Sequence, residues 1–301
     1  MYILTIDIGG TAIKLGLVNE RGTICKRSSF LMPSDYTKLT TQLHNHIQTT
    51  YEPNFVGIAI SSTGLVDTKT QEIGMSSKLY EGFGKHLVKH LRDHFKCPVY
   101  AENDGNCALL AEKWLGNGRD CSDFATIVLG TSVGGGIMVN NQLVHGKHLL
   151  AGEIGYMLFP TDKKPWEIWS IVGSTRALVE AVSEQKGQQL DGRQVSALFE
   201  NGDGQAQASV RDFIEKLAVG CYTLQYLIDP EKILIGGGIS SSSFLLPELQ
   251  KQIQRLADTI PSTVVVPQVE SCLFGNDSNL VGACYNFLVQ SEFINNKAYS
   301  W

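Results

Sequence analysis

The amino-acid sequence predicts an α/β protein made of two related lobes. Segments typical of strands alternate with segments typical of helices, an order that favours buried sheets covered by helices. Two segments, residues 2–30 and 124–146, can be laid over each other with a constant offset of 121 residues, so that Thr5 matches Thr126 and Gly9 matches Gly130. The chain therefore uses one unit of strand, Gly-turn, strand and Asn-turn twice, and we expect a lobe boundary near residues 116–120.

Each further element follows from local patterns. The first repeat should hold three strands, with a Gly-rich reversal at Gly9 and Gly10 and a turn at residues 19–22. Residues 97–116 predict a short strand, a polar turn and a helix. Other helices are expected around 37–50, 84–95, 173–185, 208–228, 246–258 and 279–290, and other strands over 55–67, 232–240 and 263–269. We expect an N-terminal lobe over 1–116, joined by a last helix near 279–298, and a C-terminal lobe over 117–278.

Composition excludes several classes of function. The formal charge of -5 arises from 30 acidic and 25 basic residues without long runs, which argues against a nucleic-acid surface. The sequence contains no run of about 18 apolar residues, so no membrane span is predicted. The first residues also lack the pattern of a secretory signal. Seven widely spaced cysteines without a CxxC pair are typical of free thiols. We therefore expect a soluble, cytoplasmic protein.

Two matching Gly-rich turns are candidate phosphate-binding loops. Glycines let the backbone approach an anion, and the amides of a tight turn can bind it. The candidate residues are Gly9, Gly10, Thr11 and Lys14 in the first turn and Gly130, Thr131, Ser132, Gly134 and Gly135 in the second. One such turn alone would be compatible with a purely structural role. Two of them, with Lys14 as a cation and Asp7 as an acceptor for hydrated Mg²⁺, favour phosphate binding.

Two further features could complete a nucleotide and substrate site. Gly236, Gly237 and Gly238 follow an apolar strand and could lie against a base or ribose, although a plain strand-to-helix turn is also possible. The P-loop and the GxGxxG fingerprint are absent from the sequence. Asp104 stands where a strand passes into a helix, a common position for ligand-binding groups. It could act as a general base or, alternatively, as the N-cap of that helix.

Five motifs, in order and spacing, resemble the ROK family of sugar kinases and sugar-responsive repressors, part of the actin, hexokinase and Hsp70 class. They are DIGGTAIKLGLV, AENDGNCALLAE, LGTSVGGGIMVNNQLVHG, AGEIGY and ILIGGGIS. The resemblance implies two actin-like lobes of ribonuclease-H-like topology around a cleft that binds ATP, Mg²⁺ and a hexose. It also implies a homodimer.

The same resemblance assigns roles to individual residues. Asp104 matches the catalytic aspartate that accepts the proton of the sugar hydroxyl. Asn103 and Glu153 would hydrogen-bond the sugar ring, and Gly64 would let that ring approach the backbone. The two Gly-rich turns would grip the phosphates, and the 236–238 cluster would line the adenosine pocket.

One motif departs from the family pattern. Many ROK members continue AGEIG with a His and a Cys-rich loop that bind structural zinc. Here Tyr156 replaces the His and no cysteine follows nearby, so we predict no zinc. The family's additional sugar-binding Glu falls on Ser170 if Ser174 aligns with the family's Ser, whereas Glu167 stands three residues earlier. Either residue could therefore face the sugar.

The same departure bears on the choice of substrate. Tyr156, Trp166 and Trp169 add flat apolar surface that could stack on a second sugar or an aglycone, unless the tryptophans are core or dimer-interface residues. A kinase that acts on the 6-hydroxyl of a β-glucoside such as cellobiose is favoured. The alternatives are a glucokinase, an N-acetylhexosamine kinase, a sugar-sensing repressor and a chaperone or filament protein of the actin-like class. A repressor is disfavoured because no basic recognition helix is evident.

Overall fold

A computed structural model of the chain describes residues 1–51, 54–74, 86–162 and 164–293. It divides into two compact units. The first unit comprises Met1–Gly116, His145–Leu150 and the chain from Asp277 onward, and the second comprises Asn117–Val144 and Ala151–Asn276. The short segment 145–150 therefore belongs to the first unit, although the residues on both sides of it belong to the second.

The first unit is built on a five-stranded sheet in the order β3-β2-β1-β4-β7. Strands β1 to β3 form an antiparallel meander, and β4 and β7 extend it in parallel to β1. The strands are β1 (Tyr2–Ile8), β2 (Ala12–Asn19), β3 (Ile24–Leu31), β4 (Ile58–Ser62) and β7 (Val99–Asn103), with a separate hairpin of β5 (Leu65–Asp67) and β6 (Glu72–Gly74). The helices are α1 (Tyr36–Tyr51), α2 (Leu87–Phe95), α3 (Asp104–Leu115) and α9 (Ser278–Gln290).

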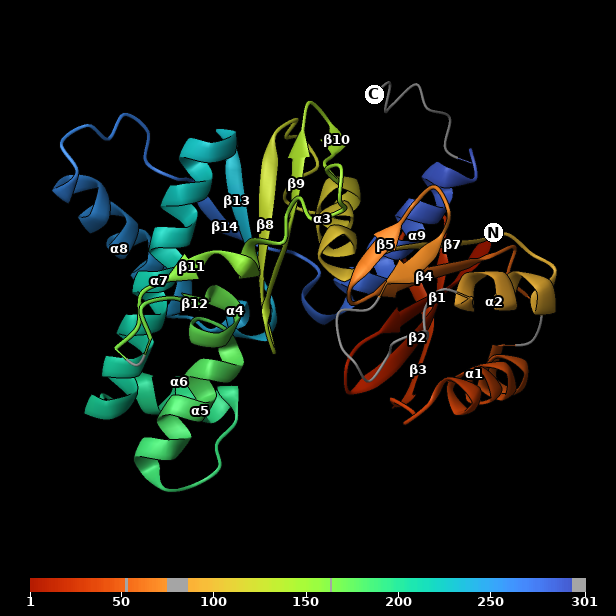
Figure 1. Cartoon of the computed structure of the whole chain (residues 1–301), viewed down its shortest axis with the longest axis horizontal. Coiled ribbons are helices and arrows are strands. Elements are labelled where there is room, and N and C mark those ends of the chain that lie inside the picture. The colour runs from red at the N-terminus through yellow and green to blue at the C-terminus, as the bar shows by residue number, and fades with distance from the viewer. Residues whose placement is uncertain (52–53, 75–85, 163, 294–301) are drawn as a thin grey trace. The chain divides into compact units, whose positions relative to one another are not determined.

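Alternation along β1 explains how this sheet is covered. Leu4, Ile6 and Ile8 pack with the buried residues of α1 and α2, whereas Ile3 packs with those of α3 and α9. Figure 1 shows the two pairs of helices on opposite faces of the sheet. Because successive side chains of a strand point to opposite faces, the odd-numbered Asp7 falls on the face covered by α3 and α9.

Helices α3 and α9 approach each other with almost no side chain between them at one point. A Cβ atom added to Gly282 of α9 would lie 1.8 Å from the backbone oxygen of Cys107 in α3. The contact continues through the fully buried Cys107, Ala283 and Phe287. Glycine at position 282 therefore sets how closely α9 can pack on the helix that begins at Asp104.

The second unit repeats the design of the first. Its sheet has the order β10-β9-β8-β13-β14, in which β8 and β9 form an antiparallel hairpin and β13 and β14 run parallel to β8. The strands are β8 (Phe124–Leu129), β9 (Val133–Val139), β10 (Gln142–Leu143), β13 (Lys232–Gly236) and β14 (Val269–Ser271), with a hairpin of β11 (Leu158–Phe159) and β12 (Glu167–Ile168). The α-helices are α4 (Trp169–Val172), α5 (Thr175–Lys186), α6 (Gly192–Glu200), α7 (Gly204–Ile228) and α8 (Leu245–Thr259), with short 3-10 turns at η2 (Ile154–Tyr156), η3 (Gly238–Ser241) and η4 (Gly275–Asp277).

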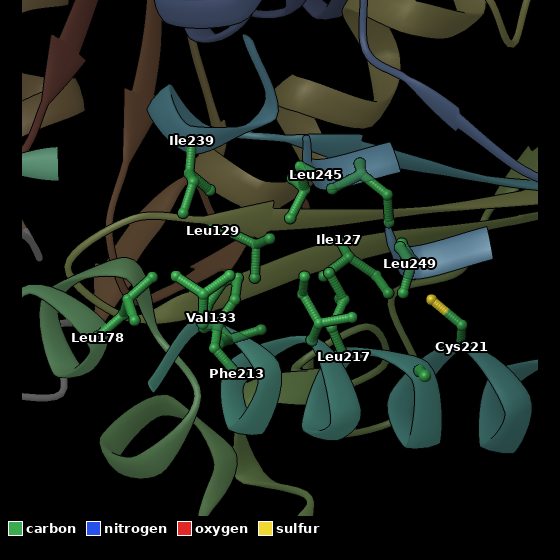
Figure 2. Close-up of a cluster of buried hydrophobic side chains, with 14 of the residues drawn as sticks. Ile127, Leu129, Val133, Leu178, Phe213, Leu217, Cys221, Ile239, Leu245 and Leu249 are labelled. Atoms are coloured by element: carbon green, nitrogen blue, oxygen red, sulfur yellow. The ribbon is translucent and has the colours of Figure 1, made fainter. Parts of the chain in front are cut away.

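The core of the second unit lies between its sheet and its helices. Figure 2 shows side chains of β8, such as Ile127 and Leu129, gathered with Leu217 of α7 and Leu249 of α8. All four are buried. Burial of such side chains contributes about 1.5–3 kcal/mol each, which fixes β8 and hence the turn that follows it.

The predicted repeat and α/β class are confirmed, since each unit opens its sheet with the same hairpin. The strand predicted over 263–269 is wrong for most of its length, because only Val269 joins the sheet, in β14. Val264 is 86% exposed, and its amide donates to the hydroxyl of Tyr226 instead of to a strand. The helix predicted over 279–290 is confirmed as α9, which ends at Gln290. The longer span to 298 in the lobe prediction includes residues 294–301, which lie outside the described residues.

Helix α6 was not predicted from the sequence, although it carries a clear start signal. Asp191 caps the helix by accepting the amide of Gln194, and the Gln194 side chain accepts the amide of Asp191 in return. This capping box satisfies two backbone donors that would otherwise lack partners.

Among the described residues, no helix combines the length and apolar character needed to cross a bilayer.

Three histidines from α1 and α2 form a stack with a consequence for acid stability. The His44 ring lies between those of His90 and His94, with ring centroids 4.7 and 3.8 Å away. Burial, followed by the charges of His94 and His90, lowers the pKa of His44 to about 4. The folded protein therefore resists protonation of His44 more than the unfolded chain does, and stability is lost as the pH falls from about 6.5 toward 4.

Replacement of His44 by Phe should reduce this loss. Phenylalanine keeps an aromatic ring in the stack but cannot take up a proton, so thermal unfolding of the variant should depend less on pH between 7.5 and 5. The measurement is the unfolding midpoint at both pH values, with His148→Gln as a control at an exposed histidine. Equal acid sensitivity of His44→Phe and the wild type would rule out the stack as the cause.

Candidate active site

The hairpin of β1 and β2 places a buried carboxylate opposite a cation. Asp7 and Lys14 face each other in the β-ladder, and Lys14 Nζ lies 3.6 Å from Asp7 Oδ2. The Asp7 side chain is 8% exposed and that of Lys14 is 47% exposed. Asp7 is therefore fixed in the unit, whereas Lys14 extends to the surface beside the Gly9–Gly10 turn.

Two further side chains orient Asp7. Ser61 Oγ of β4 donates to Asp7 Oδ1 at 3.2 Å, and Asn279 Nδ2 of α9 donates to the same oxygen at 3.0 Å. Neither residue was singled out from the sequence, because Asn279 stands 272 residues from Asp7 and no local pattern joins them. The described contact of Asp7 Oδ2 is the ion pair with Lys14.

Asp104 begins α3 directly after the C-terminal end of β7. The N-cap of this helix is Asn103, whose Oδ1 accepts the amide of Asn106 at 3.1 Å, so the interpretation of Asp104 as the cap is wrong. Asp104 Oδ1 accepts the amide of Gly105 at 2.9 Å. Asn103 Nδ2 donates to the backbone oxygen of Gly64 at 2.9 Å. Asn103 thus joins the loop after β4 to the turn that carries Asp104.

The parallel strands bring Asp7 and Asp104 to the same edge of the sheet. In the register of β1, β4 and β7, Ile8 pairs with Ser62 and Ser62 pairs with Asn103. The buried Cys107 thiol, one turn into α3, reflects this clustering of carboxylates. Burial raises its pKa well above the ordinary value, and the charges of Glu102, Asp104 and Asp7 act in the same direction. The three carboxylates are therefore near enough to the Cys107 thiol for their charges to raise its pKa.

Glu102 of β7 is a third acidic residue near this edge of the sheet, and its side chain is fully buried. Its side chain is 1% exposed and its Oε2 lies 2.9 Å from Nε2 of His145. Oε1 accepts the amide of Asn103 at 2.8 Å and the Asn106 side chain at 2.9 Å. Sequence reasoning assigned no role to Glu102 or His145, although both stand inside the quoted motifs AENDGN and LVHG.

The second Gly-rich turn lies against the start of a helix. The amide of Gly130 donates to Ser132 O across the turn, and Gly130 O accepts the amide of Arg176 in α5. Thr175 Oγ1 donates to Leu129 O. A helix N-terminus favours nearby negative charge, so this turn and α5 together are suited to phosphate groups. Gly135 is needed for close packing, because a Cβ there would lie 2.6 Å from Thr126 O.

The predicted adenosine segment lines a cavity of about 670 Å³ in the same unit. Gly237 and Gly238 form part of its wall, together with Thr175, Arg193, Ser240 and Cys272. Gly237 has a φ of 91°, and a Cβ there would lie 2.0 Å from Leu129 O, so only glycine fits. Gly236 ends β13 and is buried. Thr175 connects this cavity to the turn that contains Gly130, Thr131 and Ser132.

The predicted sugar-binding residues of the second unit differ in their surroundings. Glu153 precedes η2 and is partly buried, and burial raises its pKa. Glu167 of β12 is engaged by Lys164, whose Nζ lies 2.6 Å from Glu167 Oε2, and this hydrogen bond lowers the pKa of Glu167. Ser170 Oγ accepts the amide of Val133 at 3.1 Å and donates to its oxygen at 3.3 Å. The Ser170 hydroxyl therefore ties α4 to β9.

The two tryptophans of this region do not share one role. Trp169 is fully buried in the core of the second unit, where its ring lies against Phe159 and Gly220, so stacking of Trp169 on a sugar is wrong. Trp166 is 61% exposed and Tyr156 is 59% exposed. Burial could not be read from the sequence, because both tryptophans stand in one short polar and apolar stretch.

The chain is similar to known proteins over nearly its whole length. The sequence profile of the ROK family matches residues 3–290. A β-glucoside kinase of Listeria monocytogenes is 35% identical over 302 residues, which cover 97% of this chain and 99% of that protein. An N-acetylmannosamine kinase of Haemophilus influenzae is 30% identical and covers 95% of both chains. A solved ROK protein of Streptococcus pneumoniae in complex with sucrose is 33% identical, with a TM-score of 0.87 over 97% of this chain and all of that one.

Proposed function

Because this chain belongs to the ROK family and is an ATP-dependent carbohydrate kinase, we propose that Asp104 is the base that activates the sugar hydroxyl. The observation that carries this proposal is the position of Asp104. It stands at the end of β7, in the same row of strand ends as the Asp7–Lys14 pair of the first phosphate turn. A base close to phosphate-binding groups is what transfer to a hydroxyl requires.

The residues of the first unit divide the chemistry between them. Asp104 accepts the proton of the sugar hydroxyl as the hydroxyl oxygen attacks the terminal phosphorus atom of ATP. The bond between that phosphorus and the bridging oxygen breaks, and ADP leaves. Lys14 and the amides of the Gly9–Thr11 turn neutralise charge that develops on the transferred phosphoryl group. Asn103 holds the loop at Gly64 and caps α3, which keeps Asp104 in place. In the second unit, the turn at 130–132 and the cavity at Gly237 would hold the phosphates and adenosine of ATP.

Asp7 fits a role beside Mg²⁺. Magnesium prefers carboxylate oxygens and retains several waters. Asp7 Oδ1 is engaged by Ser61 and Asn279, so Oδ2, which lies 3.6 Å from Lys14 Nζ, is the oxygen that would face a hydrated ion. When bound, Mg²⁺ would neutralise phosphate charge.

The predicted absence of zinc stays a prediction. In the described residues no group of three His, Cys, Asp or Glu side chains is arranged to hold a metal. We further expect the enzyme to act in the cytoplasm as a homodimer.

For the acceptor, we infer a β-glucoside such as cellobiose, phosphorylated on its 6-hydroxyl. Two observations support this. The β-glucoside kinase relative is more similar to this chain than the N-acetylmannosamine kinase relative is. Tyr156 and Trp166 also present exposed aromatic surface in the unit that contains Glu153, and such surface suits a second sugar ring. Glucose and N-acetylmannosamine are the competing acceptors.

Turnover of cellobiose, glucose and N-acetylmannosamine should therefore differ, with the largest kcat/KM for cellobiose. Replacement of Trp166 by Ala should lower kcat/KM for cellobiose by about 2- to 13-fold, the loss expected from one aromatic contact of about 0.5–1.5 kcal/mol. The same change should leave kcat/KM for glucose nearly unaltered. Leu158→Ala is a matched control at another exposed apolar position of the same hairpin. A preference for glucose or for N-acetylmannosamine would overturn the assignment of the acceptor but not of the kinase.

A further inference from the structure

The buried carboxylate of Glu102 needs a counter-charge. Moving an ion out of water costs several kcal/mol unless partners compensate, and Glu102 is 1% exposed. Two of its partners, the Asn103 amide and the Asn106 side chain, are neutral donors on Oε1. The partner of Oε2 is His145, with 2.9 Å between the two atoms. His145 is therefore the group that can supply a positive charge to this site.

His145 reaches Glu102 from a separate segment of the chain. It follows β10 and opens the short stretch His145–Leu150 that belongs to the first unit. Its side chain is 29% exposed. The hydrogen bond that His145 donates to Glu102 raises the pKa of His145, burial lowers it, and the charge of Glu102 raises it further. Among the described residues, Glu102 is the charged group that shifts the pKa of His145. Lys147 and His148, farther along the segment, are exposed.

The atoms that Glu102 contacts flank Asp104 on both sides. Asn103 precedes Asp104, and its backbone amide is fixed by Glu102 while its side chain caps α3. Asn106 follows Asp104 in the first helical turn, and its side chain is fixed by the same Glu102 oxygen. A shift of Glu102 would therefore move both neighbours of Asp104 together.

We propose that Glu102 and His145 form a positioning pair that holds the Asp104 turn in its catalytic geometry. When protonated, the imidazole supplies a positive charge beside one Glu102 oxygen, and the other Glu102 oxygen accepts the hydrogen bonds that orient the turn. This inference rests on the proposed role of Asp104 as the base. Neither residue of the pair contacts the reacting atoms in this account. Their contribution is to the rate and not to the affinity for sugar or ATP.

The test compares His145→Ala, His145→Gln and Glu102→Gln with the wild type, using His148→Ala as a control on the same segment. A misplacement of about 1 Å can cost about 100-fold in rate, so kcat of His145→Ala should fall about 10- to 100-fold while both KM values change less than about threefold. His145→Gln keeps a donor and should recover part of the loss. The double variant of Glu102→Gln and His145→Gln should be no slower than the worse single variant, because the two residues act as a unit.

The pH profile separates positioning from general stability. Because the pKa of His145 is raised, the imidazole stays protonated at pH values above the ordinary pKa of a histidine and loses its proton as the pH rises further. The kcat of the wild type should therefore fall on the alkaline side. That alkaline fall should be absent in His145→Gln.

Two outcomes would overturn the inference. One is a wild-type kcat in His145→Ala, and the other is an unchanged alkaline fall in His145→Gln. If His145→Ala does not fold, His145→Gln and Glu102→Gln decide the question. Asp104→Asn is measured in parallel. A slow Asp104→Asn with a normal His145→Ala refutes the pair alone, whereas a normal Asp104→Asn refutes the base.

Discussion

Replacement of Asp104 by Asn should lower kcat for sugar phosphorylation by about 10²- to 10⁴-fold, the contribution typical of one well-placed general base. Asparagine has the same shape, and its side-chain oxygen can still accept the amide of Gly105. The helix cap is unaffected, because it is provided by Asn103. The variant should therefore fold normally and lose the capacity to accept a proton.

Binding measurements distinguish this loss from damage to the site. Titration calorimetry should give affinities of Asp104→Asn for ATP and for cellobiose within about threefold of the wild type. Asp93→Asn is a control at an exposed carboxylate on α2. A fall in affinity as large as the fall in kcat would mean that Asp104 binds the sugar without acting as the base.

Replacement of Gly282 by Ala should destabilise the first unit strongly. The added methyl group would lie 1.8 Å from the oxygen of Cys107, and the helices can separate only by disturbing the fully buried Ala283 and Phe287 beside the contact. Overpacking of this kind costs about 1–3 kcal/mol and occasionally more. The free energy of unfolding from urea titration should fall by at least this amount.

The same change should also slow the enzyme. Helix α9 carries Asn279, which holds Asp7, and α3 carries Asp104, so any separation of the two helices moves both carboxylates. Gly204→Ala is the matched control, since a Cβ at the start of α7 would meet nothing within 4 Å. Equal stability of Gly282→Ala and Gly204→Ala would show that the close approach of α3 and α9 is not required.

The sequence predicted much of the fold because its strongest signals are local. Each Gly-rich segment predicts a strand, a turn and a second strand, and the first segment matches the second with a constant offset of 121 residues. Both hairpins were confirmed as β1–β2 and β8–β9. The β-branched run at 263–266 misled the prediction, because strand propensity does not decide whether a neighbouring strand is available.

The candidate site was predicted only as far as its motifs reach. Asp7, Lys14, Asn103 and Asp104 stand in short patterns, and the structure gathers them at one edge of one sheet. Asn279 and His145 could not be assigned, because their contacts span 272 and 43 residues. Such contacts depend on where the chain returns to the first unit. The buried position of Trp169 depends in the same way on how α4 and α7 pack.

A single-turnover experiment tests the central claim most directly. Wild-type enzyme and Asp104→Asn, each in excess over radiolabelled ATP and saturated with cellobiose and Mg²⁺, are mixed and quenched at short times. We expect rapid transfer of the terminal phosphate to the disaccharide by the wild type and transfer slowed at least 100-fold in the variant. Formation of the sugar phosphate at the same rate by both proteins would contradict the role of Asp104.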